Sequence, residues 1–284
     1  MSNNLVTLRV WGDFACFTRP EMKVERVSYP VMTPSAARGV LEAVFWEPEI
    51  YYLIDSIHII RRGSWFSFRR NEVTSVISID NAKAWMKSPE KVSPIQAGGG
   101  APDGTQRNML ALQGVEYLIT AEVQLTEIGK KRGHPINTYR IEIERRAKMG
   151  KCFHRPYLGV REFAADFDWE NNPQTALERR SAELGKNWQH IWPEEDLGLM
   201  LYDVFAPEAR AHGFRWLPEG DHLADLHAHP ERQKKTKKSP VVAPRFEGVL
   251  AKPEALFFFA DVRAAKIDCH PNRARFVQNR VMEI

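Results

Sequence analysis

The first residues of the chain alternate between apolar and polar side chains. Val6, Leu8 and Val10 are apolar, and Thr7 and Arg9 lie between them. A period of two residues is typical of a strand with one buried face. The pattern therefore predicts a strand here, at the edge of a sheet core.

A helical period follows after a long loop. Thr33 offers an N-cap and Pro34 suits the first helical turn, whereas Pro48 disfavours any continuation of the helix. The apolar positions between them recur at helical spacing, at Ala37, Val40, Leu41 and Val44. We predict a helix over residues 34–45.

Two strand-like runs come next, over residues 50–60 and 65–76, with Gly63 in the turn between them. Two such runs around a short turn predict a β-hairpin. Arg69 and Arg70 lie near its middle, so the hairpin is expected to carry basic side chains that can grip a phosphate backbone.

The middle of the chain continues with regular elements and loops. We expect a flexible glycine- and proline-rich loop over 88–104 and then a strand over 115–125. A helix is expected over 137–149, with Gly150 as its C-cap. A loop and a strand are expected within 150–167, with Arg161 on a strand-like run. Together with the earlier elements, the order is strand, helix, strand, strand, helix, strand. This order is that of a ferredoxin-like domain.

We therefore predict an α+β fold, with a ferredoxin-like domain over residues 1–168 that carries the basic β-hairpin. Residues 169–284 are expected to form a smaller, mainly antiparallel β domain with strands near 197–205 and 255–262. A flexible insert rich in lysine and histidine is expected near 218–244. Histidines on a loop without a rigid frame favour simple solvation over metal binding, so no metal site is predicted.

The distribution of charge favours binding to nucleic acid. The 284 residues carry a net charge of +4, and much of the positive charge falls in clusters, at Arg61/Arg62, Arg69/Arg70, Lys130/Lys131/Arg132, Arg145/Arg146 and Lys234/Lys235/Lys237/Lys238. Such clusters neutralise phosphates, although scattered solvated charge is the alternative.

No apolar run approaches the roughly 20 residues of a membrane span and no signal peptide opens the chain, so we expect a cytoplasmic protein that does not bind membranes.

The loop over residues 12–32 mixes aromatic and cationic side chains. These are Phe14, Phe17 and Tyr29 with Arg19, Lys23 and Arg26. Aromatic rings stack on bases and cations pair with phosphates in single-stranded RNA complexes. A surface loop that tucks in its aromatic side chains would have the same composition, so the loop leaves both interpretations open.

Four stretches resemble one protein family. Residues 11–46 read WGDFACFTRPEMKVERVSYPVMTPSAARGVLEAVFW, and shorter stretches are RRNEV at 69–73, CFHRPYLGVREF at 152–163 and DLGLMLYD at 196–203. They look like the fifth family of CRISPR-associated (Cas) proteins in its d-type, the type I-C or Dvulg form, which belongs to the RAMP superfamily. The resemblance is spread over most of the chain and is densest before residue 170.

The resemblance implies an RRM-like, ferredoxin-like fold and an endoribonuclease. Such a protein cuts the CRISPR repeat in precursor RNA and stays on the 5′ handle of the guide RNA within a surveillance complex. The implied partners are the seventh-family backbone subunit and the eighth-family large subunit. The cut needs no metal or other cofactor, because the ribose 2′-hydroxyl attacks the neighbouring phosphate and leaves a 2′,3′-cyclic phosphate.

The resemblance also points to catalytic positions, and the chain departs from the family pattern at some of them. The family has a tyrosine at the end of the first helix, where this chain has Phe45, and a Lys-His or Lys-Tyr pair at the start of the second, where it has Thr138 and Tyr139. We therefore expect Tyr139 to take part in the chemistry, with His134 or His154 as proton-transfer partner. The alternatives are a structural Tyr139 on a helix face and a hydrogen-bonding role for His154.

RNA binding is expected from nine basic side chains. They are Arg19, Lys23, Arg26, Arg69, Arg70, Arg107, Arg145, Arg146 and Arg161. Two rival functions follow from the departures and from relatives: a non-catalytic RNA-binding scaffold, and a metal-dependent DNA nuclease. The nuclease would need a carboxylate cluster, and the sequence offers none that convinces.

Overall fold

One long strand, β5 (Gly104–Leu125), organises the fold. The computed structural model describes residues 4–98, 100–187, 193–211 and 255–277. The main sheet, antiparallel except for β2, has the order β6 (Asp166–Trp169), β1 (Leu5–Ala15), β5, β3 (Ile50–Arg61) and β9 (Lys266–Asp268), and both β2 (Arg26–Val27) and β4 (Ser64–Val73) also pair with β5. A smaller antiparallel sheet holds β10 (Arg275–Phe276), β8 (Leu256–Val262) and β7 (Glu195–Asp203). The predicted mixture of helices with antiparallel sheet is confirmed.

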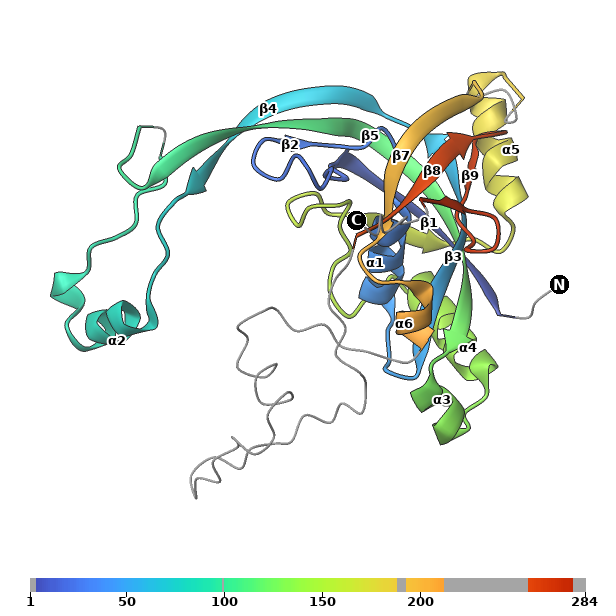
Figure 1. Ribbon diagram of the computed structural model, residues 1–284, viewed down its shortest axis with the longest axis horizontal. Coiled ribbons are helices and arrows are strands. Elements are labelled where there is room, and N and C mark those ends of the chain that lie inside the picture. The colour runs from blue at the N-terminus through green and yellow to red at the C-terminus, as the bar shows by residue number, and fades with distance from the viewer. Residues whose placement is uncertain (1–3, 99, 188–192, 212–254, 278–284) are drawn as a thin grey trace, which may run out of the picture.

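The helices cover the sheet or lie at its ends (Figure 1). They are α1 (Pro34–Val44), α2 (Ile79–Lys87), α3 (Glu127–Arg132), α4 (Ile136–Lys148), α5 (Pro173–Leu184) and α6 (Pro207–Ala211), with a 3₁₀ turn, η1, at Pro89–Lys91. The predicted helices over 34–45 and 137–149 are confirmed to within one residue at each end. Thr33 caps α1 as expected, because its side-chain oxygen accepts a hydrogen bond from the backbone N–H of Ala36 at 3.3 Å.

The predicted hairpin between residues 50–60 and 65–76 is wrong in its pairing. β3 and β4 do not pair with each other; β3 pairs with the second half of β5 and β4 with the first half. At Gly63 the chain only kinks, with φ +81°, and a Cβ there would lie 2.6 Å from the carbonyl oxygen of Gln113. The reversal of direction comes later, between Val73 and Gly104, where α2 lies.

β4 and the first half of β5 form an arm, residues 64–113, that extends away from the sheet and carries α2 at its far end (Figure 1). Its strand residues alternate between two faces, because successive side chains of a strand point in opposite directions. Arg70 lies opposite Arg107 in the ladder and Arg69 opposite Asn108. Arg69 and Arg70 therefore lie on opposite faces of the arm.

β1 is not an edge strand, contrary to the prediction, because β6 pairs with one side of it and β5 with the other. The strand expected within 150–167 is reduced to β6, which begins only at Asp166. Arg161 lies in a turn, where Leu158 N–H donates to the carbonyl of Phe163 at 2.8 Å. That turn is held against the first loop, since Cys16 N–H donates to the carbonyl of Leu158 at 2.9 Å.

One hydrophobic core joins the early and late parts of the chain. Buried Leu8 and Leu41 belong to the same cluster as Met200 and Phe258 of the smaller sheet. A division into two domains at residue 168 stays a prediction. The insert near 218–244 lies outside the described residues, and among the described helices none has the length and apolarity to cross a membrane.

His58 is expected to make the protein less stable in acid. It lies on β3 opposite Lys266, and burial, with Lys266 adding to it, lowers its pKa from an ordinary 6.5 to about 4. Between about pH 6.5 and 4, His58 is therefore protonated in the unfolded chain and neutral in the folded protein. The free energy of unfolding falls as the pH drops through this range. We expect a loss of about 2 kcal/mol between pH 7 and 4.5 from this group.

Urea unfolding of wild type and of His58→Leu at both pH values measures this loss. Leucine does not titrate, so the variant should lose less stability on acidification than wild type does. An equal loss in both proteins would contradict the assignment.

Candidate functional site

A cavity of about 680 Å³ lies beside the first turns of α4. We call it the α4 cavity, and its lining is Phe45, Glu47, Glu49, His134, Thr138, Tyr139, Ile141, Glu142 and Arg146. Four of the five sequence-predicted catalytic positions, Phe45, His134, Thr138 and Tyr139, thus meet in one place. They come from the end of α1, the link between α3 and α4, and the first turn of α4.

His134 and Tyr139 are in contact in this cavity. His134 Nδ1 lies 3.3 Å from the Tyr139 hydroxyl, with the ring centroids 6.4 Å apart. Their placement follows from the local chain: Gly133, in the left-handed region at φ +73°, ends α3, and the short link to α4 then carries His134 back toward the helix. A histidine and a hydroxyl at this distance can pass a proton between them.

Burial raises the pKa of Tyr139 above its ordinary value, and the carboxylate of Glu49 adds to the rise, with Arg132 opposing it. The side chain is only 6% exposed. A raised pKa keeps the phenol protonated at neutral pH. Tyr139 is therefore suited to donate a proton, and it is not suited to act as the initial base.

Two carboxylates that the sequence did not single out hold cations around the cavity. Buried Glu49 pairs with Arg132 of α3. Glu142 of α4 accepts hydrogen bonds from Arg145 and Arg146, each at 2.8 Å, and these bonds lower its pKa to about 2. The low pKa keeps Glu142 anionic at neutral pH, so the cavity is polar and the arginines paired with Glu142 are held in place.

His154 lies elsewhere. It is exposed, its Nδ1 is 3.5 Å from the carbonyl of Arg155, and it lines a different cavity, of about 410 Å³, that opens on α1 beside Ser35 and Gly39. Its backbone N–H, like that of Phe153, donates to the carbonyl of Ala43. The structure therefore does not bring His154 together with Tyr139.

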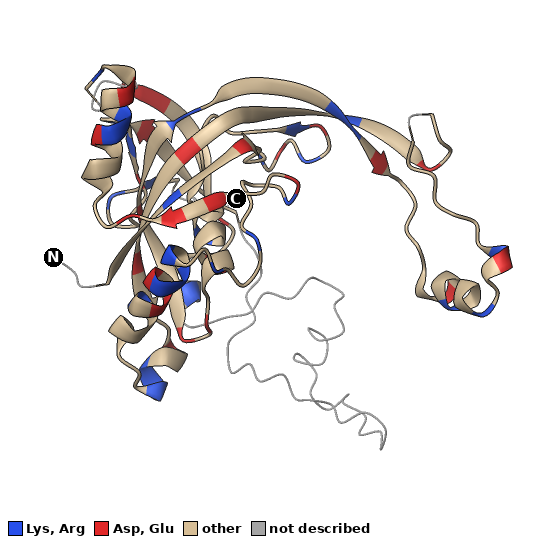
Figure 2. Ribbon diagram, turned by 180° about the vertical axis from the view of Figure 1, so that it is seen from behind, with Lys and Arg blue, Asp and Glu red and all other residues tan. Residues whose placement is uncertain are grey.

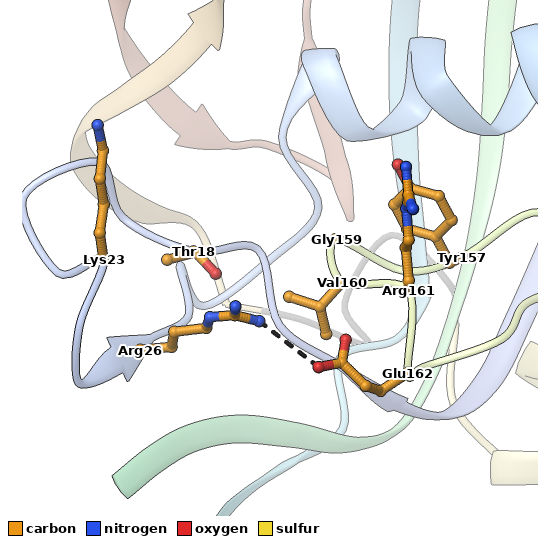
Figure 3. Close-up of a pocket in the computed structure, with 8 residues that line it drawn as sticks. All are labelled: Thr18, Lys23, Arg26, Tyr157, Gly159, Val160, Arg161 and Glu162. Carbon is orange, nitrogen blue, oxygen red and sulfur yellow. Dashed lines mark ion pairs between the residues drawn. The ribbon is translucent and has the colours of Figure 1, made fainter. Parts of the chain in front are cut away.

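A second, basic site lies beneath the arm, in a pocket of about 550 Å³. We call it the basic pocket, and Figure 3 shows Lys23 and Arg26 on one side of it and Tyr157 and Arg161 on the other. Three predicted RNA contacts, from the first loop and the turn at 157–163, are thus brought together. The pocket also contains an acid, Glu162, which the sequence did not single out.

Glu162 ties the arm to the body of the protein. Its carboxylate accepts a hydrogen bond from Arg70 Nη1 at 2.7 Å and lies 3.8 Å from Arg26 Nη1. Arg70 also pairs with Glu72. A carboxylate between two guanidiniums lies where the oxygens of a nucleic-acid phosphate can bind.

The other predicted cations are spread around these sites. Arg107 shares the ladder position of Arg70, and Figure 2 shows the resulting basic band across the middle of the arm. Arg19 stacks over the Tyr29 ring at 4.7 Å. Arg69, on the opposite face of the arm, is apart from the basic pocket. Arg146 lines the α4 cavity, and Arg145 pairs with Glu142 of its lining.

Among the described residues, no three or more His, Cys, Asp or Glu side chains are arranged to hold a metal ion. The histidines at 222, 227 and 229 lie outside those residues.

Comparison with known proteins gives consistent results. A family model for Cas5d, described as CRISPR-associated protein (Cas_Cas5), matches residues 5–241. Two proteins named CRISPR pre-crRNA endoribonuclease Cas5d are similar in sequence. The one from Mannheimia succiniciproducens is 41% identical over 217 residues, which are 75% of this chain and 90% of the relative. The one from Thermus thermophilus is 44% identical over 200 residues, which are 69% and 72% of the two chains.

Two solved structures share the fold. One, described as a CRISPR-associated protein, has a TM-score of 0.52 at 16% identity and covers 93% of this chain and 90% of that chain. The other, a functionally uncharacterized protein from Streptococcus mutans, has a TM-score of 0.51 at 15% identity and covers 94% and 92%.

Proposed function

The chain belongs to the Cas5d family of CRISPR-associated proteins, and on that premise we propose that it is an endoribonuclease that processes precursor CRISPR RNA. The observation that carries the proposal to particular residues is the contact between His134 and Tyr139 in the α4 cavity. The protein then stays on the 5′ handle as a subunit of a surveillance complex. Its partners there are the seventh-family backbone subunit and the eighth-family large subunit, and its compartment is the cytoplasm.

The ferredoxin-like arrangement is part of the proposal. The strand order β6-β1-β5-β3, antiparallel throughout, with α1 between β1 and β3 and α4 between β5 and β6, supports it. The smaller sheet of β10, β8 and β7 supports a second, β-rich unit. In this arrangement both helices that border the α4 cavity are the helices of the ferredoxin-like unit.

The reaction is a transfer of the phosphate within the RNA. The 2′-oxygen attacks phosphorus while its proton passes to Nε2 of His134, and the bond from phosphorus to the 5′-oxygen breaks. Tyr139 donates its proton to the leaving 5′-oxygen and regains one from Nδ1 of His134 through their 3.3 Å contact. The products are a 2′,3′-cyclic phosphate and a 5′-hydroxyl, and the raised pKa of Tyr139 supports its role as the acid.

The guide RNA follows the basic pocket and the α4 cavity. The proposed contacts are Arg19, Lys23, Arg26, Arg69, Arg70, Arg107, Arg145, Arg146 and Arg161. Lys23, Arg26 and Arg161 act together, because they line one pocket. Arg69 reaches RNA only if the strand also passes the opposite face of the arm, so its contribution is separate from that of Arg70.

Glu162→Gln is expected to bind repeat RNA more tightly than wild type, by about fivefold. The carboxylate competes with phosphate for Arg26 and Arg70, and the amide keeps the shape without the charge. Filter binding at two salt concentrations measures the change. The matched control is Asp166→Asn, which removes an exposed carboxylate paired with Arg155; equal effects of the two changes, or weaker binding by Glu162→Gln, would contradict the competition.

The test of the proposed function is incubation of the protein with its own repeat RNA in excess chelator. A single cut at a fixed position is the expected result. Tight binding without a cut would instead make the protein a handle-binding scaffold, the alternative favoured by the missing hydroxyl at Phe45. Cleavage that appears only when a divalent metal is added would contradict the metal-free mechanism.

A further inference from the structure

Arg145 and Arg146 share the carboxylate of Glu142 in unequal ways. Arg145 uses both Nε and Nη2, each 2.8 Å from a carboxylate oxygen, and its Nη1 lies 3.4 Å from the sulfur of Met149. Arg146 uses only Nε, at 2.8 Å. Within the described chain no hydrogen bond is seen from either Nη group of Arg146, so these groups are left to bind something else.

The guanidinium of Arg146 is also held from a second side. Its Cζ lies 5.1 Å from the centroid of the Phe45 ring, a cation–π contact. Phe45 is itself fixed, because it is buried and its carbonyl accepts a hydrogen bond from the Tyr52 hydroxyl at 2.7 Å. Arg146 is therefore oriented before any RNA arrives, whereas most exposed arginines must be ordered on binding.

Charge in the α4 cavity makes this guanidinium important. The lining has three carboxylates, Glu47, Glu49 and Glu142, and among the described residues Arg146 is the only arginine or lysine that lines it. A phosphate that enters to meet His134 and Tyr139 would be repelled unless a cation faces it. Glu142 is shared by Arg145 and Arg146, so these three side chains together carry a net charge of +1, and the low pKa of Glu142 keeps the arrangement intact across neutral pH.

We propose that Arg146 is a catalytic residue, whose two Nη groups hold the non-bridging oxygens of the scissile phosphate and stabilise the charge that builds up on the phosphorane. The inference rests on the proposed endoribonuclease function and adds the cation to its base and acid. Arg146 forms and breaks no covalent bond. It stabilises the transition state more than the bound substrate, because the phosphorane carries the extra charge.

The test compares Arg146→Gln, Arg146→Lys and a matched control, Arg140→Gln. Arg140 lies on the same helix and pairs with Glu144 at 3.0 Å in the same i,i+4 manner, and it does not line the α4 cavity. With saturating protein, in chelator, Arg146→Gln should cut repeat RNA about 10²- to 10³-fold more slowly than wild type. Arg146→Lys should recover part of the rate, and Arg140→Gln should cut like wild type.

A sulfur substitution at the scissile phosphate checks for direct contact. Wild type should discriminate between the two phosphorothioate diastereomers, and Arg146→Gln should lose that discrimination, which a purely structural role would leave intact. Three results would overturn the role of Arg146 and leave the proposed endoribonuclease function standing. They are unchanged cleavage by Arg146→Gln, a loss in rate accounted for by weaker binding, and unchanged discrimination between the diastereomers. A wild-type protein that binds the RNA and never cuts it would overturn the proposed function, and the inference with it.

Discussion

Tyr139→Phe is expected to slow cleavage of repeat RNA by about 10²- to 10⁴-fold with little change in affinity, as is typical for loss of one general acid. The phenyl ring keeps the packing of Tyr139 in the core, so the fold should survive. Only the proton donor beside His134 is lost. Single-turnover cleavage at saturating protein measures the rate, and equilibrium binding measures the affinity.

The pH dependence of this defect follows from the pKa of Tyr139. Burial and Glu49 raise it above the ordinary value of about 10, so the hydroxyl is protonated at pH 7 and at pH 9 alike. The defect should therefore be the same at both. Tyr51→Phe, which removes a hydroxyl outside the α4 cavity, should cut normally; a Tyr139→Phe protein that also cuts normally would move the chemistry away from the α4 cavity.

Asp203→Ala is expected to destabilise the protein by about 3–5 kcal/mol, the usual cost of removing one partner from a buried ion pair. Arg38 of α1 donates to both carboxylate oxygens of Asp203, at 2.7 and 3.0 Å, and Arg210 lies 3.4 Å away. Burial alone would raise the pKa of Asp203, but these guanidiniums outweigh burial and lower it. Without the carboxylate, buried Arg210 and partly buried Arg38 compete for Glu42 alone.

Urea unfolding at neutral pH measures the free-energy difference. Asp196→Ala, on the exposed surface of the same strand, is the control and should change stability by less than about 1 kcal/mol. In Asp203→Ala, α1 and the smaller sheet should unfold in the same transition as the rest of the protein. Equal stabilities of the two variants would contradict it.

The elements that sequence reasoning found are those with one buried face and a clear cap. α1 has both, and Thr33 fixes where it begins. β4 was predicted, as the strand over 65–76. Its partner in the arm, residues 104–113 of β5, was missed, because that half of β5 leaves many side chains partly exposed and has no regular burial pattern. α2 buries none of its residues, and a helix without a buried stripe leaves no helical period to detect.

Only part of the site could be predicted from the sequence, namely the residues that lie close together along the chain. Tyr139 and His134 lie five residues apart and were found, but the acids that organise the cations pair across long stretches of chain. Glu49 meets Arg132 from 83 residues away, and Glu162 meets Arg70 from 92 residues away. Adjacent arginines in a strand also look like one cluster in the sequence, whereas alternation places Arg69 and Arg70 on opposite faces of the arm.

The most direct test of the central claim is the chemistry of the ends that the protein leaves on its repeat RNA in excess chelator, read by mass spectrometry of both fragments. We expect a 2′,3′-cyclic phosphate on the upstream fragment and a 5′-hydroxyl on the downstream one, and no cut when the nucleotide before the scissile bond lacks its 2′-hydroxyl. A 3′-hydroxyl with a 5′-phosphate, or cleavage of the 2′-deoxy substrate, would contradict the claim that the 2′-oxygen is the nucleophile activated by His134.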